Sequence, residues 1–379
     1  ILTADADGKG SLLSEANLMS KIFKTVDRKP DDLAALLYTS GTTGRSKGAM
    51  LTQNNLLSNA KTLKKLWQVT ESDILIHALP IFHTHGLFVA LNTAMLAGAK
   101  VNFLPKFDID EIIERLHAST LLMGVPTFYT RLLADYRLTE ELTKNMRLFI
   151  SGSAPLLSET HEEFTKRTGH HILERYGMTE TNMITSNPYH GERRPGTVGK
   201  PLADVQMKIT DPETGTEMAE GEIGMIEVRG PNVFKGYWNM PDKTALELRE
   251  TGYFITGDLG KLSSDGYLSI VGREKDLIIS GGYNVYPKEV EDILNELNQI
   301  DETAVFGIQD NDLGERVVAA LVLENDKNFN QRKIEVFANE KLARYKQPKE
   351  YFVLDSLPRN SMGKVQKNEL RKRFSSSDI

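Results

Sequence analysis

The eleven residues YTSGTTGRSKG, at positions 38–48, carry side chains well suited to holding an anion. The three glycines let the backbone turn its N–H groups toward a ligand, because no Cβ atom obstructs them. Hydroxyl donors and two cations, Arg45 and Lys47, stand between the glycines. The stretch therefore predicts a phosphate-binding loop, although a flexible linker has a similar composition. It is not a Walker loop, because a glycine rather than Ser or Thr follows Lys47.

A second group of side chains invites a metal interpretation. His83 and His85 stand two residues apart in FHTHG, but neither a cysteine nor an acidic third ligand lies nearby in the sequence. Zinc normally takes three or four such ligands, so we do not expect a zinc site here. The chain has no cysteine at all, which excludes disulfides, thiolate metal sites and cysteine nucleophiles.

Short apolar runs alternate with amphipathic segments before residue 190 or so. LAALLY (33–38) predicts a buried strand directly before the glycine loop, and a helix capped by Thr52 is expected soon after it. Such alternation predicts a parallel sheet covered by helices on both faces. Ligands bind at the carboxyl ends of such strands. The polar loops 39–48, 81–86 and 151–155 are therefore expected to converge on one site.

The pattern of expected strands and helices changes twice further along the chain. Short strands separated by glycine turns predict a β-rich subdomain over about 197–272. A strand, a Gly-Gly turn and amphipathic helices then predict a small α+β domain over 273–379. We expect an α/β fold with a large N-terminal domain, 1–272, built from parallel or mixed sheets and helices, followed by this small domain.

Composition narrows the possible partners. The net charge is −6 and 40% of the residues are hydrophobic, which gives no electrostatic reason to expect nucleic acid or an anionic membrane. We find no apolar run of membrane-spanning length and no signal-peptide pattern, so no membrane insertion is expected. The chain opens at Ile1 without a methionine, and we expect a fragment or a processed chain.

Seven motifs occur in an order typical of one known superfamily. The stretches are YTSGTTGRSKG, LPIFHTHGL, SGSAPL, ERYGMTET, YFITGDLG, GREKDLIISGGYNVYPKEVE and LPRNSMGKVQK. Together they resemble the signatures of the adenylate-forming enzymes, which include acyl-CoA synthetases, luciferases and peptide-synthetase adenylation domains. FHTHGLFVA and MGVPTFYTRLL are most similar to the group of malonyl-CoA and methylmalonyl-CoA synthetases. Members of that group usually carry more than a hundred further N-terminal residues.

The resemblance implies an acid–CoA ligase with ATP and Mg²⁺, and with CoA as co-substrate. A carboxylate and MgATP would give an acyl-adenylate and pyrophosphate, and the CoA thiol would then displace AMP. The expected partners are a small carboxylic acid, ATP and CoA, with no nucleic acid. The expected location is the cytoplasm, or an organelle matrix after processing, and the oligomeric state stays open.

The resemblance also assigns roles to single residues. Lys364 matches the catalytic lysine of adenylation, Glu180 the magnesium-linked glutamate and Thr179 a phosphate contact. Asp258 matches the acceptor for the ribose hydroxyls, with Arg273 as its partner. Without the motifs, ordinary roles would explain these residues as well. Lys364 could be a solvated lysine in a basic tail, Glu180 a carboxylate that caps a helix start, and Asp258 an aspartate in a turn.

Further positions follow the same motifs. Lys275 matches the hinge of the small domain, and Gly281 and Gly282 match the turn that meets CoA. The remaining predicted ATP-binding residues are Thr39, Ser40, Gly41, Thr42, Thr43, Gly44, Lys47, Gly152, Ser153, Ala154, Glu174, Tyr176 and Gly177.

The acid is harder to predict than the nucleotide. A diacid needs cations for its second carboxylate, whereas a fatty acid needs an apolar tunnel. His83 matches a catalytic, pocket-lining position, Ser153 adds a hydroxyl, and Arg131 and Arg193 are the candidate cations. An aryl or short fatty acid is the nearest alternative substrate. A non-catalytic nucleotide-binding fragment is the alternative from another class.

Overall fold

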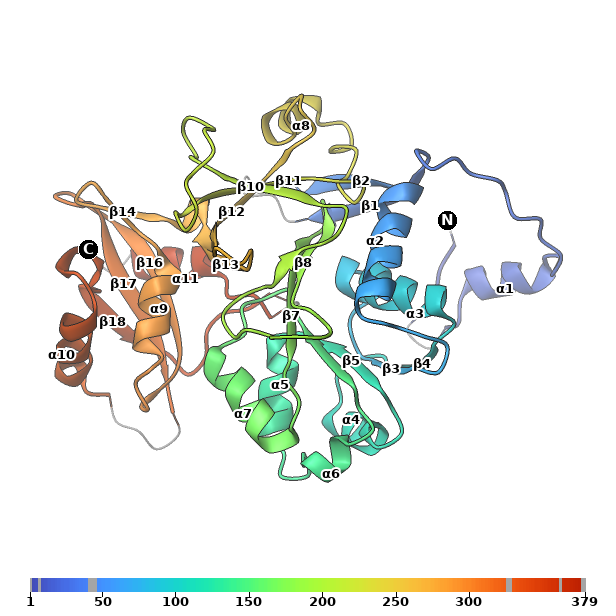
Figure 1. Ribbon diagram of the computed structural model, residues 1–379, viewed down its shortest axis with the longest axis horizontal. Helices are drawn as coiled ribbons and strands as arrows, with labels where there is room; N and C mark the ends of the chain where they lie inside the picture. The colour runs from blue at the N-terminus through green and yellow to red at the C-terminus, as the bar shows by residue number, and fades with distance from the viewer. Residues whose placement is uncertain (1, 6–7, 40–45, 325–328, 361–362, 376–379) are drawn as a thin grey trace.

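The computed structural model describes residues 2–5, 8–39, 46–324, 329–360 and 363–375. It has the predicted α/β architecture, with a seven-stranded mixed sheet, a four-stranded antiparallel sheet and a two-stranded sheet in the larger part of the molecule and a five-stranded sheet in the C-terminal part (Figure 1). Within the described residues, no helix is both long and apolar enough to cross a membrane.

The largest sheet has the strand order β4-β3-β5-β6-β7-β8-β9. The strands from β4 to β7 run parallel, whereas β8 and β9 join antiparallel. Every residue of β5 and β6 is buried, as expected for strands covered on both faces. The bounds are β3 (Ile74–His77), β4 (Lys100–Phe103), β5 (Leu121–Gly124), β6 (Leu148–Ser151), β7 (Leu173–Met178), β8 (Asn182–Ser186) and β9 (Lys200–Pro201).

Helices connect these strands and supply the faces of the core. Helix α2 (Gln53–Leu66) begins at Thr52, whose side chain forms the predicted cap together with Asn55. A π-helical turn (His85–Leu91) precedes α3 (Asn92–Ala97), which ends at left-handed Gly98. The other helices of this part are α4 (Ile109–Leu116), α5 (Pro126–Leu133), α6 (Glu140–Thr143) and α7 (Ser158–Thr168).

The predicted role of residues 33–38 is wrong in one respect. β1 (Leu33–Thr39) is not a buried strand of the large sheet, because it pairs antiparallel with β2 (Lys47–Thr52) and most of its apolar side chains are at least partly exposed. An apolar run of six residues fits an exposed hairpin strand as well as a buried one. The glycine loop therefore joins two strands of a hairpin, and helix α2 begins only after the second.

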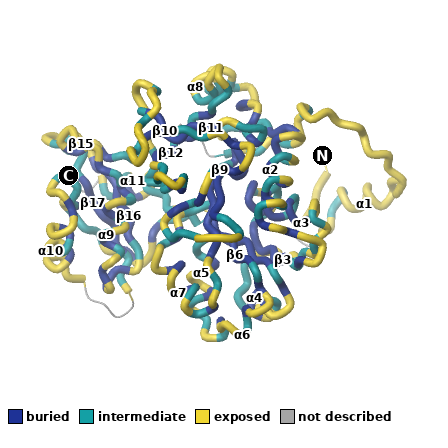
Figure 2. The backbone as a smooth tube through the Cα atoms, in the orientation of Figure 1, coloured by how far each residue is buried: buried dark blue, intermediate teal, exposed yellow. Residues whose placement is uncertain are grey.

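The segment before β1 is also largely exposed. Figure 2 shows the chain around α1 (Ser11–Leu18) as an exposed arm, and no residue of that helix is buried. Leu18, Ile22 and Phe23 are each at least 80% exposed. These side chains contribute nothing to the main core, which starts at Ala49.

The antiparallel sheet contains β10 (Gln206–Thr210), β11 (Gly224–Arg229), β12 (Phe254–Leu262) and β13 (Leu268–Arg273). Helix α8 (Pro241–Glu247) lies between β11 and β12 in the chain. Glu227 in β11 is fully buried and accepts from Arg249 Nε at 2.8 Å, while Lys208 Nζ lies 3.2 Å from the same carboxylate. Burial opposes its ionisation, but hydrogen bonds from Arg249, Thr210 and Lys208 leave the pKa of Glu227 lowered overall.

Replacing Glu227 with glutamine is expected to destabilise this sheet by about 2 kcal/mol at pH 7, because Arg249 and Lys208 lose their buried partner. The pKa of Glu227 is lowered on folding, so its contribution is present above the ordinary value of 4.5 and is lost as the pH falls through the folded value. Thermal unfolding of both proteins at pH 7 and pH 4 checks this, since the difference in Tm should shrink at the lower pH. An equal difference at both pH values would contradict it.

The C-terminal sheet has the order β15-β14-β17-β16, with β18 parallel to β17. Two separate apolar clusters, both drawn from residues after 277, form its core. Figure 1 shows this part beside β12 and β13, and α9 packs against β13. Its elements are η2 (Glu274–Asp276), β14 (Ile278–Ser280), β15 (Tyr283–Val285), α9 (Pro287–Leu294), β16 (Ile300–Asp310), β17 (Gly314–Leu323), α10 (Gln331–Lys341), η3 (Arg344–Lys346), β18 (Glu350–Val353) and α11 (Lys367–Ser375).

Candidate active site

Lys364 brings the C-terminal part of the chain to residues of the seven-stranded mixed sheet and the four-stranded antiparallel sheet. Its side chain remains accessible to solvent, but the surrounding protein lowers its pKa. The positive charges of Arg273 and Lys275 lower that pKa further, and the carboxylates of Asp258 and Glu180 oppose them. Four predicted site residues thus act on a single ammonium group, which is the arrangement expected of a charged active site.

The segment carrying Lys364 is held by its own backbone and by helix α5. Asn360 Oδ1 accepts a hydrogen bond from the backbone N–H of Lys364 at 3.0 Å. Gly363 has a φ of +76°, and a Cβ atom added there would lie 3.7 Å from the Thr127 side chain. The lysine therefore reaches the site from a turn that lies against the first turn of α5.

Asp258 is clamped between two side chains. Arg273 Nε lies 2.7 Å from Oδ1, and the Tyr176 hydroxyl donates to Oδ2 at 2.6 Å. Burial, followed by the Asp258 charge, raises the pKa of Tyr176 well above its ordinary value, so its hydroxyl keeps its proton. Each carboxylate oxygen has two lone pairs, so Asp258 retains acceptor capacity for a ligand with two neighbouring hydroxyls.

Glu180 follows β7, and its carboxylate is buried. Oε1 accepts from the Tyr237 hydroxyl at 2.9 Å. The same hydroxyl accepts from Lys47 Nζ at 3.0 Å, so the last residue of the glycine loop before Gly48 is tied to the predicted magnesium-linked carboxylate. Neighbouring Thr179 is also buried.

The loop after β6 has a strained backbone. Ser153 adopts a φ of +72°, which non-glycine residues rarely do, and its Oγ lies 3.2 Å from His85 Nδ1. Such strain persists where the surrounding structure over-determines it, often at functional sites. Gly152 leaves room for Arg175 beside it, because a Cβ atom there would lie 2.4 Å from the guanidinium carbon and would displace that side chain.

Arg175 is the residue that sequence reasoning missed. Its side chain in β7 is buried, and neither Nε nor Nη2 has a hydrogen-bond partner in the described structure. Burial lowers its pKa to about 9, so the guanidinium is still a cation at neutral pH. A buried cation without a counter-ion costs several kcal/mol, so this position is suited to an incoming anion. A lone arginine in the stretch HHILERYGM, part of which forms β7, was the signal that could have identified it.

The charge of Arg175 contributes to a lowered pKa of two histidines. Burial, Arg175 and Lys364, in that order, lower the pKa of His83 to about 4. Burial and then Arg175 lower the pKa of His85 well below its ordinary value. Both imidazoles are therefore neutral near pH 7, and they are available as hydrogen-bonding groups.

The two arginines predicted to bind the second carboxylate have other partners. Arg131 is exposed, and its Cζ lies 5.3 Å from the centre of the Phe107 ring. The Arg193 guanidinium donates to the backbone carbonyls of Pro188, His171 and Tyr189. Among the described contacts, neither arginine touches Lys364, Arg175, His83 or His85.

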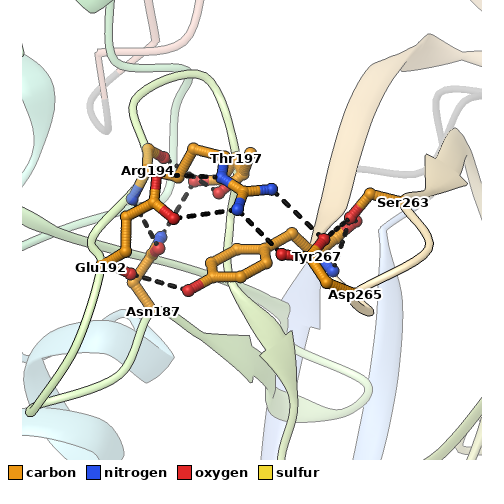
Figure 3. Close-up of polar contacts among 7 residues, drawn as sticks. All are labelled: Asn187, Glu192, Arg194, Thr197, Ser263, Asp265 and Tyr267. Atoms are coloured by element: carbon orange, nitrogen blue, oxygen red, sulfur yellow. Dashed lines mark hydrogen bonds and ion pairs between the residues drawn. The ribbon is translucent and has the colours of Figure 1, made fainter.

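Arg194, the neighbour of Arg193, has a structural role. Figure 3 shows it between Glu192 and Asp265, and its Cζ lies 4.1 Å from the centre of the Tyr267 ring. These contacts connect the loop before β9 to the turn between β12 and β13. The other residues drawn in this network are Asn187, Thr197 and Ser263.

The remaining predicted residues fall into three groups. Glu174 is buried, with Oε1 3.5 Å from His161 Nδ1. Gly281 and Gly282 have φ of +59° and +81° in the β14–β15 turn, a conformation that needs glycine. Lys275 lies in η2, and burial lowers its pKa.

The described residues include only part of the predicted phosphate loop. Thr39 and Lys47 pair across β1 and β2 at its base. Around β6 and β7, Ala154 and Gly177 are partly buried. Ser40, Gly41, Thr42, Thr43 and Gly44 lie outside the described residues.

No cluster of three or more His, Cys, Asp or Glu side chains that could hold a metal ion occurs in the described ranges. Glu180 supplies a single buried carboxylate. One such ligand suits Mg²⁺ that arrives already coordinated by phosphate oxygens and water.

Family models match both parts of the chain. One, described as AMP-binding enzyme, matches residues 2–238, and another, described as AMP-binding enzyme C-terminal domain, matches residues 289–364. A malonate–CoA ligase of Arabidopsis thaliana is 40% identical over an alignment that covers 92% of this chain and 62% of that protein. The chain thus spans about three-fifths of the length of this curated relative.

Two crystal structures of MatB from Rhodopseudomonas palustris are also similar. The ATP-bound form is 56% identical with a TM-score of 0.97, and the match covers 99% of this chain and 75% of that chain. The apo form is 55% identical with a TM-score of 0.82, covering 99% and 74%. The structure of this chain is therefore more similar to the ATP-bound form than to the apo form.

Proposed function

This chain belongs to the AMP-binding enzyme family, and from that premise we propose that its protein is an AMP-forming malonate–CoA ligase. In the first step a malonate oxygen attacks the α-phosphorus of ATP, an acyl–phosphate bond forms, and the α–β bond breaks to release pyrophosphate. In the second step the CoA thiol loses its proton and its sulfur attacks the acyl carbon. The acyl–phosphate bond breaks, and malonyl-CoA and AMP leave.

Lys364 is the proposed cation for the first step. Negative charge accumulates around the α-phosphate as the carboxylate attacks, and a fixed ammonium group there stabilises the transition state. Arg273 and Asp258 support this role because they act on Lys364 and also form the clamp expected to hold the ribose. Asp258 and Arg273 would therefore position the nucleotide next to Lys364, which supplies the catalytic charge.

The observation that carries the choice of malonate is the buried Arg175 guanidinium, whose Nε and Nη2 have no hydrogen-bond partner among the described residues. A diacid presents one carboxylate to ATP and needs a cation for the other, whereas a fatty acid would leave that cation buried and unpaired. His83, neutral near pH 7, is the proposed hydrogen-bonding partner close to the reacting carboxylate. Similarity to a malonate–CoA ligase supports the same substrate. We therefore assign the binding of the second carboxylate to Arg175, and no longer to Arg131 or Arg193.

The metal enters this proposal as part of the MgATP substrate. Glu180 would hold it, and Thr179 and the glycine loop would hold the phosphates. Bound Mg²⁺ neutralises charge on the phosphate oxygens and on the pyrophosphate that leaves. For the second step, we propose that the C-terminal part rotates about Lys275 and brings Gly281 and Gly282 to the CoA thiol.

Pyrophosphate exchange into ATP tests the proposed substrate. The assay is run with malonate, methylmalonate, benzoate and hexanoate on the complete protein, without CoA. We expect exchange with malonate, and with or without methylmalonate, at a rate about 100-fold or more above that with benzoate or hexanoate. A monoacid has no second carboxylate, so it would leave the buried Arg175 without a partner. Exchange with benzoate or hexanoate but not malonate would refute the substrate and leave the ligase class intact. Nucleotide binding without exchange for any acid would favour the non-catalytic alternative.

A further inference from the structure

Tyr237 is absent from every motif considered above, yet it connects the two ends of the phosphate site. Its hydroxyl lies 2.9 Å from Glu180 Oε1 and 2.6 Å from Glu247 Oε2, and it accepts from Lys47 Nζ at 3.0 Å. Lys47 Nζ also lies 3.4 Å from the Glu247 carboxylate. One hydroxyl therefore joins the loop cation, the metal-linked carboxylate and a second carboxylate from α8.

The backbone fixes this position firmly. The segment 235–238 lies beside β2 and forms an antiparallel bridge between Tyr237 and Ala49, with Trp238 N–H bonded to Gly48 O at 2.8 Å and Met50 N–H bonded to Gly236 O at 2.9 Å. The Tyr237 side chain is 2% exposed and packs edge-on against Phe234. The hydroxyl thus has little freedom, and its place relative to β2 follows from main-chain hydrogen bonds.

The charges explain why a hydroxyl is needed there. Glu180 and Glu247 both approach one oxygen atom, and without a bridge they would repel each other. A tyrosine hydroxyl has one hydrogen, so it donates to one carboxylate at a time while it accepts from Lys47. Glu247 has a second cation, with Lys243 Nζ 2.7 Å from Oε1. Glu180 gains more from the hydroxyl, since no lysine contacts it directly among the described residues.

We propose that Tyr237 is a positioning residue for MgATP: its hydroxyl holds the Glu180 carboxylate and the Lys47 ammonium at the separation that the metal-bound polyphosphate requires. Glu247 serves as the counter-ion that keeps Lys47 on the hydroxyl before the nucleotide arrives. This inference rests on the proposed function, because it takes Glu180 and Lys47 as ligands of MgATP. It adds two residues from the segment 235–247 to the nucleotide site.

Tyr237→Phe tests the proposal, because phenylalanine keeps the ring and its packing and removes only the hydroxyl. Equilibrium dialysis without any acid would measure binding of MgATP and, separately, of AMP, which lacks the β- and γ-phosphates. We expect MgATP to bind about ten-fold more weakly, because hydrogen bonds to charged groups are lost, and AMP to bind as it does to the wild type. Tyr253→Phe is the matched control, since among the described residues that hydroxyl has a single hydrogen bond, to Gln206 at 3.4 Å. This control should change neither ligand.

The pairing with Glu180 is tested by combining substitutions. In a Glu180→Gln background, Tyr237→Phe should cause less than about a two-fold further loss in MgATP binding, since the two residues act together. Equal losses for AMP and MgATP in Tyr237→Phe would indicate general damage and would overturn the proposal. Wild-type binding of MgATP by the variant would overturn it as well. If the wild type itself bound no MgATP, the proposed function would fail first, so the two failures can be told apart.

Discussion

Lys364→Ala is expected to slow formation of malonyl-adenylate by about 10²–10³-fold, because the ammonium group that stabilises charge at the α-phosphate is lost. The affinity for MgATP should change much less, since Asp258, the proposed ribose-binding residue, is held by Arg273 and Tyr176 and not by Lys364. Pyrophosphate exchange measures the first step. Equilibrium binding of MgATP measures the affinity of the enzyme for the nucleotide before the reaction.

The second half-reaction supplies the internal comparison. Synthetic malonyl-adenylate and CoA should give malonyl-CoA at nearly the wild-type rate in the variant, because Lys364 is assigned to adenylation only. Lys333→Ala is a suitable control, since Lys333 is exposed on α10 and lies in the same part of the chain. If Lys364→Ala left pyrophosphate exchange unchanged, or slowed both half-reactions equally, the assigned role would be wrong.

Much of the fold could be predicted because local signals and tertiary packing agree. The cap at Thr52 set the start of α2, and the short apolar runs at β5 and β6 proved fully buried. The prediction for β1 failed because hydrophobicity alone does not say which strand will pair with it. The π-helical turn at His85–Leu91 was likewise invisible, since a shift from four- to five-residue spacing over one turn leaves no clear periodic signal.

The candidate site shows a different limit. Motifs predicted roles for Asp258 and Glu180 one at a time, but the hydrogen bonds that fix them come from Tyr176 and Tyr237, far away in the sequence. Tertiary pairing of this kind has no local signature. Arg175 illustrates the same limit, because only the structure shows that its Nε and Nη2 are buried without a partner in the part of the chain described.

Replacing Arg175 with methionine is expected to raise the KM for malonate by about 30- to 1,000-fold, because a desolvated charge pair with the second carboxylate is lost. Methionine is unbranched and apolar, so the pocket should then accept a monoacid such as butyrate better than the wild type does. Pyrophosphate exchange with both acids measures this change in preference. Arg131→Met is the matched control, since Arg131 is exposed and stacks near Phe107.

The same substitution should stabilise the ligand-free protein, which is unusual for a change in a buried site. Burial lowers the pKa of Arg175 from 12.5 to about 9, so the folded state is penalised for holding the cation at every pH below about 9. Removing that penalty is expected to add about 1–4 kcal/mol, seen as a higher Tm that is equal at pH 6 and pH 8. Saturating malonate together with MgATP should raise the Tm of the wild type more than that of the variant. A lower Tm for Arg175→Met without ligand would show that the guanidinium already has a partner, and the argument for a diacid substrate would then lose its main support.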